Sequence, residues 1–169
     1  MRQARKKRPL EVVRAINALR RMIRGLRSKA DTIERGLKVS AAQLFVLSEL
    51  AQIPDQSVKD LATVTMTTHS TVSQVVGQLI VKGLVTRTPD QADGRRSVLR
   101  LTRQGTKLVK QAPRAIQEDL IEGFGTLRPT ERRGLVVGLE KWLAAAGLGG
   151  TRSGMLFEKP PPGKRGKRK

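Results

Sequence analysis

The chain has 169 residues, and its 34 lysines and arginines outnumber its 14 aspartates and glutamates, for a formal net charge of +20 at pH 7. A charge this far from neutral favours a polyanionic partner. The sequence holds no cysteine, which excludes disulfides and thiol nucleophiles, and with one histidine and no tyrosine we expect no enzyme, metal site or cofactor. Because no apolar run approaches the ~18 residues of a membrane span and no apolar signal core follows the basic start, we expect a cytoplasmic protein.

Both ends of the chain are basic. Residues 1–9 are expected to form an N-terminal arm. From Gly147 onward the chain is rich in glycine and proline and closes on KPPPGKRGKRK, which predicts a disordered basic tail over residues 147–169. The part between the ends is basic in its own right.

Residues 10–37 predict one long helix. Apolar residues recur there at alternating steps of four and three, a heptad pattern that is typical of a helix packed along a partner helix. That partner is either another helix of the same chain or a helix of a second subunit. Gly36 is the expected C-terminal stop. The apolar seam consists of Val12, Ile16, Leu19, Ile23, Leu26, Ala30, Ile33 and Leu37.

A helix-turn-helix is predicted next. Ser40 caps a helix that begins with AAQLFVLSEL, and Ser57 caps a short helix, VKDLATV. After the break at TMTT, a further helix runs from about Thr68 to Lys82, and Gly83 ends it. A short helix, a turn, a second helix and then a hairpin are typical of a winged helix-turn-helix.

The helix that begins near Thr68 presents one face of small or amide side chains without charge. Short side chains let a helix enter the major groove, and glutamine pairs bidentately with adenine. The alternative is an ordinary solvated face, but such faces usually carry Lys and Glu. His69 in the first turn either donates to a phosphate or stays in solvent, since the helix dipole disfavours its charged form. The predicted base contacts are Ser70, Thr71, Ser73, Gln74 and Gln78, and the predicted buried stripe is Val72, Val75, Val76, Leu79 and Ile80.

Two strands follow, LVTRT and SVLRLT, separated by PDQADGR. That connection is too long for a two-residue turn, so its tip should project into solvent. Arg95 and Arg96 lie where the tip turns back, and arginine is the residue that enters narrow, electronegative minor grooves. Asp93 can brace the loop through a turn or a salt bridge. Two solvated arginines are the alternative, but next to a groove-reading helix we favour contact with DNA.

Two helices complete the prediction. Thr102 caps a helix over about 103–124, which Pro113 should kink or weaken. Thr130 caps a last helix over 131–146, whose apolar face includes Leu135, Leu139 and Trp142. The fold class is therefore mainly α with a small β-hairpin, that is, a winged helix-turn-helix with additional helices on either side.

These residues resemble the MarR family, the multiple-antibiotic-resistance type of winged-helix regulator, over about residues 10–146. The most specific part is the wing, where the family's Asp-x-Arg pattern leads into a strand ending in Leu-Thr and then a glycine. Here these are Asp93, Arg95, VLRLT and Gly105. GLKVSAAQLFVLSEL resembles the family's second helix, and VKDLATV with THSTVSQVVGQLIVKGLV resembles its helix-turn-helix. Gly94 replaces a residue that is often basic, so both Arg95 and Arg96 stay candidates for the groove.

The resemblance implies a homodimer built from the first and last two helices. Residues 10–38 and 103–146 would form the helical dimerisation region, and residues 39–102 the winged helix-turn-helix. It also implies binding to double-stranded DNA at a pseudo-palindromic operator, repression, and release by a small aromatic or anionic effector. The dimer agrees with the heptad seam found independently. The expected interface residues are Val12, Ile16, Leu19, Ile23, Leu135, Leu139 and Trp142.

We therefore expect a nucleoid-associated, DNA-binding transcriptional regulator that acts as a repressor. The rival hypothesis is an architectural or RNA-binding protein that uses charge more than sequence, which the net charge of +20 favours. The uncharged recognition face counts against that rival, because a sequence-blind binder would gain more from lysines there. The basic tails should add salt-sensitive affinity for any nucleic acid.

Overall fold

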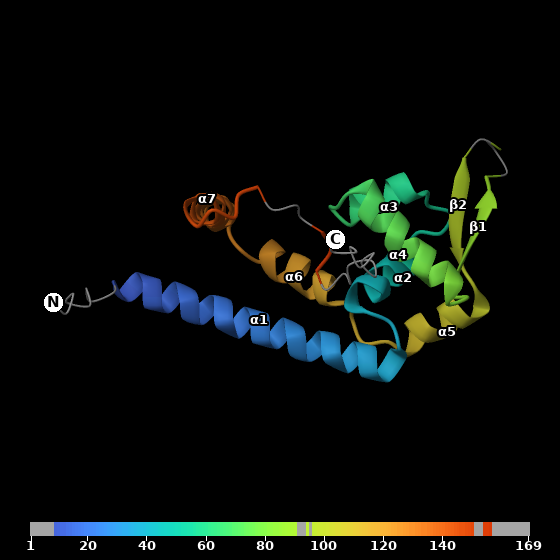
Figure 1. Cartoon of the computed structure of the whole chain (residues 1–169), viewed down its shortest axis with the longest axis horizontal. Coiled ribbons are helices and arrows are strands. Elements are labelled where there is room, and N and C mark those ends of the chain that lie inside the picture. The colour runs from blue at the N-terminus through green and yellow to red at the C-terminus, as the bar shows by residue number, and fades with distance from the viewer. Residues whose placement is uncertain (1–8, 91–93, 95, 151–153, 157–169) are drawn as a thin grey trace, which may run out of the picture.

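The computed structural model describes residues 9–90, 94, 96–150 and 154–156. Along these residues a β-hairpin separates the first four helices from the last three (Figure 1). The fold class predicted from the sequence, mainly α with a small hairpin in a winged-helix order, is confirmed. The elements are α1 (Leu10–Leu37), α2 (Ala41–Gln52), α3 (Val58–Val64), α4 (His69–Val81), β1 (Val85–Pro89), β2 (Ser97–Leu101), α5 (Arg103–Gln111), α6 (Ile116–Gly125) and α7 (Pro129–Ala145).

Helix α2 is the centre of the core. Eight of its twelve residues are buried, among them Leu44, Phe45 and Leu47. The helix is apolar on nearly all sides, as expected of an element that is surrounded by others. It contacts α1, α3, α4, α5, α6 and β2, and Figure 1 shows it between α1 and the lobe that carries α3, α4 and the hairpin. Helix α2 therefore sets the position of α4 relative to α1.

Hydroxyl side chains cap four of the helices, and three of these caps, Ser40, Ser57 and Thr102, were predicted. Ser40 accepts the backbone N–H of Gln43 at the start of α2, and Thr68 accepts that of Thr71 at the start of α4. Ser57 and Thr102 cap α3 and α5 in the same way. Each bond satisfies a backbone donor that the helix itself leaves unpaired. These local signals explain why the beginnings of the helices were predictable.

Helix α1 has the predicted bounds, but Gly36 is not its stop, and α7 begins earlier than predicted. Helix α1 continues through Gly36, and Lys38 adopts the left-handed conformation (φ 59°) that ends it. The helix extends because Leu37 packs against the core. Helix α7 begins at Pro129 rather than after Thr130. Proline is pre-organised for the first helical position, so the cap moves to Arg128, whose N–H donates to Glu131 at 2.8 Å.

The predicted helix over 103–124 is wrong as a single element, because it is two helices. Helix α5 ends at Gln111, and Ala112 is extended (φ −78°, ψ 146°). Pro113 has no N–H to donate and excludes the helical conformation for the residue before it. The chain resumes as α6 at Ile116, which is buried. The break lets α6 pack against both α1 and α2.

The hairpin is antiparallel, with Val85 opposite Leu101 and Pro89 opposite Ser97. Val85 at the base of the hairpin and Val98 and Leu99 on β2 are buried, whereas the residues of β1 after Val85 are exposed. Gly83 adopts a positive φ of 67°, which turns the chain from α4 into β1, as predicted. The hairpin therefore projects from the lobe as a wing, and its tip residues 91–93 and 95 lie outside the described residues.

The terminal segments proposed from the sequence are described only in part. Of the basic arm over 1–9 the structure describes Pro9 alone, and of the tail over 147–169 it describes 147–150 and 154–156. Met155 is only 7% exposed and belongs to the core cluster, and the Leu156 carbonyl accepts from Gln117 Nε2 at 3.4 Å. This short segment therefore packs on α6, because its apolar side chain fills space at the core. Met155 and Leu156 therefore depart from the disorder predicted for this part of the chain.

Candidate nucleic-acid interface

Packing orients helix α4. Val72, Val75, Val76 and Leu79 are all at most 2% exposed and face the core. Ile80, predicted to share that stripe, is 37% exposed instead, because it lies at the edge of the apolar face. The opposite side carries the predicted base contacts. His69 and Ser70 are exposed, whereas Thr71, Ser73, Gln74 and Gln78 are half-buried.

The first turn of α4 is uncharged and rich in hydroxyls. Thr68 Oγ1 lies 3.0 Å from the hydroxyl of Ser70 and 3.0 Å from that of Thr71. No acidic residue lies in this turn, so the positive end of the helix dipole is not neutralised by its own helix. Such a turn favours a negatively charged ligand.

Gln78 is a predicted base contact whose amide is bonded within the fold. Its Oε1 accepts from Gln43 Nε2 at 2.7 Å, and Gln43 is only 4% exposed. Lys82 Nζ donates to Gln43 Oε1 at 2.9 Å and to the Lys38 carbonyl at 2.6 Å. A bidentate contact with adenine needs both the oxygen and the nitrogen of the amide. Gln78 therefore cannot make that contact while it holds α4 against α2.

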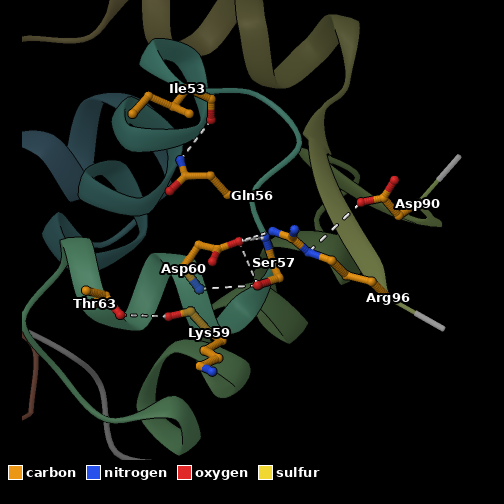
Figure 2. Close-up of polar contacts among 8 residues, drawn as sticks. All are labelled: Ile53, Gln56, Ser57, Lys59, Asp60, Thr63, Asp90 and Arg96. Atoms are coloured by element: carbon orange, nitrogen blue, oxygen red, sulfur yellow. Dashed lines mark hydrogen bonds and ion pairs between the residues drawn. The ribbon is translucent and has the colours of Figure 1, made fainter. Parts of the chain in front are cut away.

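Arg96 also points inward. Its Nη2 donates to Asp60 Oδ2 on α3, and its Nε lies 4.0 Å from Asp90 Oδ2 at the end of β1 (Figure 2). The prediction had Arg96 reaching DNA, whereas the structure has it bracing the wing against α3. Arg95, the other predicted groove arginine, and Asp93, the predicted brace, lie outside the described residues. Among the described residues, Asp60 and Asp90 provide the bracing carboxylates.

Asp60 joins this brace to the start of α3. Its Oδ2 accepts the Ser57 N–H at 2.9 Å and the Ser57 hydroxyl at 2.8 Å. These hydrogen bonds from Ser57, and then the nearby Arg96 guanidinium, lower the pKa of Asp60. The carboxylate is therefore charged at neutral pH and serves the helix cap and the wing together (Figure 2).

A second set of contacts fastens β2 to the connection between α2 and α3. The Leu99 N–H donates to the Gln56 carbonyl at 2.9 Å, and Arg100 pairs with Asp55. Gln56 is buried and its Nε2 donates to the Ile53 carbonyl at 2.8 Å. Wing, α3 and the end of α2 are thus linked by backbone, amide and ionic bonds, which makes the wing part of the helix-turn-helix lobe.

The ion pair between Asp60 and Arg96 should contribute little to stability. Their side chains are 43% and 44% exposed, and water and salt screen such pairs, so we expect a coupling of at most about 0.5 kcal/mol. A double-mutant cycle with Asp60→Asn and Arg96→Gln, followed by urea unfolding, measures it. Because the folded-state pKa of Asp60 is lowered, its contribution is complete above the ordinary carboxyl range and is lost as the pH falls below it. A coupling that stays the same as the pH falls through the whole carboxyl range would contradict the assignment.

Apolar side chains remain uncovered on α1 and α7. The C-terminal half of the α1 seam packs within its own chain, since Ile33 is buried and Leu26, Ala30 and Leu37 lie against the core. The N-terminal half does not, and α7 has no buried residue at all. Of the predicted interface residues, Ile16 and Leu19 are half-buried, and the exposed ones are Val12, Ile23, Leu135, Leu139 and Trp142.

The described residues contain neither a candidate metal site nor a helix that could span a membrane. No group of three or more of their His, Asp and Glu side chains could hold a metal ion. None of the helices in the described ranges is long and apolar enough to cross a membrane.

Residues 36–96, from the end of α1 to the wing, match the model of the MarR family. Over these residues the chain is similar to the MarR family. The resemblance noted in the sequence is thus confirmed. An HTH-type transcriptional regulator of Mycobacterium tuberculosis is 35% identical over 94 residues, and one of Mycobacterium leprae is 34% identical. These matches cover 56% of this chain and 66% of each relative, which is just under two thirds of their length.

Solved structures of the MarR family share this fold. The Staphylococcus aureus MepR–DNA complex aligns with a TM-score of 0.52 and 26% identity over 76% of this chain and 94% of that one. Bordetella bronchiseptica BpsR, whose DNA binding is regulated by 6-hydroxynicotinic acid, aligns with a TM-score of 0.51 and 28% identity over 76% and 98%. MarR of Escherichia coli, at 24% identity, has the same fold with a TM-score of 0.51 over 82% and 99%.

Sequence reasoning missed the side chains that position α4 and the wing. Asp60 follows Ser57 by three residues, which is a capping-box signal, but its bond to Arg96 spans 36 residues of sequence. Gln43 is likewise the capping partner of Ser40, yet it also bonds Gln78, 35 residues away. In both cases the local signal was present in the sequence, and only the second, long-range partner was hidden.

Proposed function

We propose that this protein is a transcriptional regulator that binds double-stranded DNA through α4 and the wing. One observation carries the proposal: the outward face of α4 is uncharged, and its first turn has no carboxylate, in a chain of net charge +20. The uncharged face suits contact of α4 with base edges in the major groove, and the net positive charge of the chain suits contact with phosphates. The solved relative MepR, which is complexed with DNA, supports the same proposal.

The proposed assembly is a homodimer on a pseudo-palindromic operator. The uncovered apolar residues of α1 and α7 support it, because a helix such as α7 without a buried residue gains little stability until another surface covers it. In a two-fold dimer the α4 helices would enter successive major grooves about 34–36 Å apart. Binding of this kind within a promoter would repress transcription.

The proposal includes release of the protein from DNA by a small effector, and one cleft is the candidate binding site for that effector. It lies between α1 and the start of α6, has a volume of about 240 Å³, and is lined in part by Lys29, Arg114 and Asp119. Both cations are paired, Lys29 with Asp119 and Arg114 with Glu122. An anionic effector would have to displace those carboxylates. The volume is below the usual ~300 Å³ of small-molecule pockets, so a compact effector is expected.

Gln74 is the residue whose loss should best separate specific from non-specific binding. We expect Gln74→Ala to weaken operator binding by about 1–3 kcal/mol and to leave random-sequence binding nearly unchanged, because a base contact serves only its own sequence. Titration of both DNAs at about 150 mM salt measures it. Gln111→Ala, an exposed glutamine at the end of α5, is the matched control. Equal losses on both DNAs would contradict a base-reading role.

The operator itself is found by footprinting the DNA upstream of the protein's own gene with an excess of random competitor. A protected segment with two-fold symmetry supports the proposal. Binding that the competitor removes from every fragment would instead support the charge-driven architectural function, which the net charge of +20 favours.

A further inference from the structure

The N-terminal two thirds of α1 carries a concentrated array of exposed arginines. Residues 10–30 contain six cations and a single carboxylate, Glu11. Five of the six are arginines, all of them exposed. We call them the arginine face, and they are Arg14, Arg20, Arg21, Arg24 and Arg27. With a rise of 1.5 Å per residue, the array extends over roughly 20 Å of helix.

Three residues of the arginine face, Arg14, Arg21 and Arg24, are directed away from the apolar seam, whereas Arg20 and Arg27 flank it. In a helix of 3.6 residues per turn, Arg14 and Arg21 lie almost opposite Val12 and Ile23. Covering the seam with a second subunit would therefore leave these arginines in solvent. An open depression of about 700 Å³ lies among them, where the short side chains of Ala15, Asn17 and Ala18 separate Arg14, Arg21 and Arg24.

The arginines lack carboxylate partners within the described part of the chain. The polar contact found for them is the hydrogen bond from Arg20 to Asn17 Oδ1 at 3.3 Å, whereas the neighbouring Lys29 is paired with Asp119. A face that serves only solubility usually mixes lysine with glutamate. Arginine instead suits phosphate, because its planar fork donates two parallel hydrogen bonds and is weakly hydrated.

The arginine face is remote from the proposed recognition surface. Helices α1 and α4 both pack on α2, and Figure 1 shows the N-terminal half of α1 extending away from the lobe with α3, α4 and the hairpin. From Lys38, whose carbonyl bonds Lys82 at the end of α4, Arg14 is 24 residues, or about 36 Å, along the chain. A straight duplex held by α4 and the wing would not follow α1 in that direction.

We propose that the arginine face binds the phosphate backbone of a second DNA duplex, so that one protein assembly joins two DNA segments. This goes beyond the proposed regulator function, since it needs no contact by α4 with the second duplex. Nucleic acid is favoured over an anionic membrane because a membrane-bound amphipathic helix inserts its apolar face. The C-terminal half of that seam, from Leu26 to Leu37, is already packed on the core.

The test uses the full-length protein on an immobilised operator duplex and measures capture of a second, labelled duplex that lacks the operator. The variant is Arg14→Gln, Arg21→Gln and Arg24→Gln together. The control is Lys110→Gln on α5 with Arg133→Gln and Lys141→Gln on α7, three exposed cations whose replacement removes the same charge. We expect the variant to lose capture roughly tenfold or more and to lower the salt slope of capture by about two to three, and the control to retain both.

Operator footprinting of the same proteins reports separately on α4. We expect the footprint of the arginine variant to be unchanged. The proposal would be overturned if the arginine variant captured as much second duplex as the wild type does. It would also be overturned if the wild type captured no more second duplex than the immobilised operator captures without protein. So would wild-type binding to anionic lipid vesicles without duplex capture. A missing footprint with intact capture would refute the regulator function and leave the second-duplex site standing.

Discussion

Replacing Gly105 by alanine is expected to destabilise this protein by about 3 kcal/mol or more. A Cβ at this position would lie 2.2 Å from the Leu84 carbonyl oxygen and 3.2 Å from its carbon, and both are backbone atoms. The first turn of α5 cannot retreat freely, because the Thr102 N–H donates to that same carbonyl at 3.1 Å. The Thr102 hydroxyl also donates to the Gly83 carbonyl at 2.7 Å.

Thermal unfolding followed by circular dichroism measures the effect, and we expect the midpoint of Gly105→Ala to fall by roughly 10 °C. Gly25→Ala is the matched control, because Gly25 lies within α1 with nothing within 4 Å of an added Cβ. That change should stabilise the protein by up to about 1 kcal/mol through the higher helix propensity of alanine. If both substitutions behaved alike, α5 would not approach Leu84 as closely as the structure has it.

The second large effect is expected at the uncovered apolar surface. Ile23 on α1 is 38% exposed and Leu139 on α7 is 43% exposed. Changing both to glutamine should separate the proposed dimer, because a polar amide at a helix–helix contact would be buried without a partner. Sedimentation should then give half the wild-type mass. Operator affinity should fall about 10²–10⁴-fold, because the two half-sites are no longer bound by linked modules.

Ile53→Gln is the control for that experiment. Ile53 is 56% exposed and lies between α2 and α3, away from the seam. We expect its variant to keep the wild-type mass and the wild-type affinity. A double variant that sediments as the wild type does would refute the assignment of these two helices to the interface.

The winged-helix order was predictable because most of its signals are local. The hydroxyl caps at Ser40, Ser57, Thr68 and Thr102 each act on backbone within three residues. The spacing of valines in α4 identified the buried side, and hence the outward face, with Ile80 as the exception. Gly83 indicated the turn into the wing, because glycine readily adopts the positive φ that the structure has there.

The predictions that were wrong involve competition between a local preference and packing or a neighbouring residue. Gly36 does not stop α1, because Leu37 gains contact with the core. Pro113 breaks the chain into two helices rather than bending one, because Ala112 becomes extended and α6 then finds its own contacts. Met155 lies in a glycine-rich stretch that looked like a tail, yet it is buried against the core.

For the candidate interface, the sequence by itself determined which residue types face outward on α4 and that two arginines, Arg95 and Arg96, follow the tip of the wing. Periodicity and caps act over one or two helical turns, so they can be found without knowledge of the fold. Only the tertiary structure decided what each polar side chain bonds. It directs Arg96 to Asp60 and Gln78 to Gln43, because folding brings residues about 35 positions apart to hydrogen-bond distance. The carboxylate of Asp60 and the amide of Gln43 thus bond side chains that, judged from their own segments alone, were expected to contact DNA.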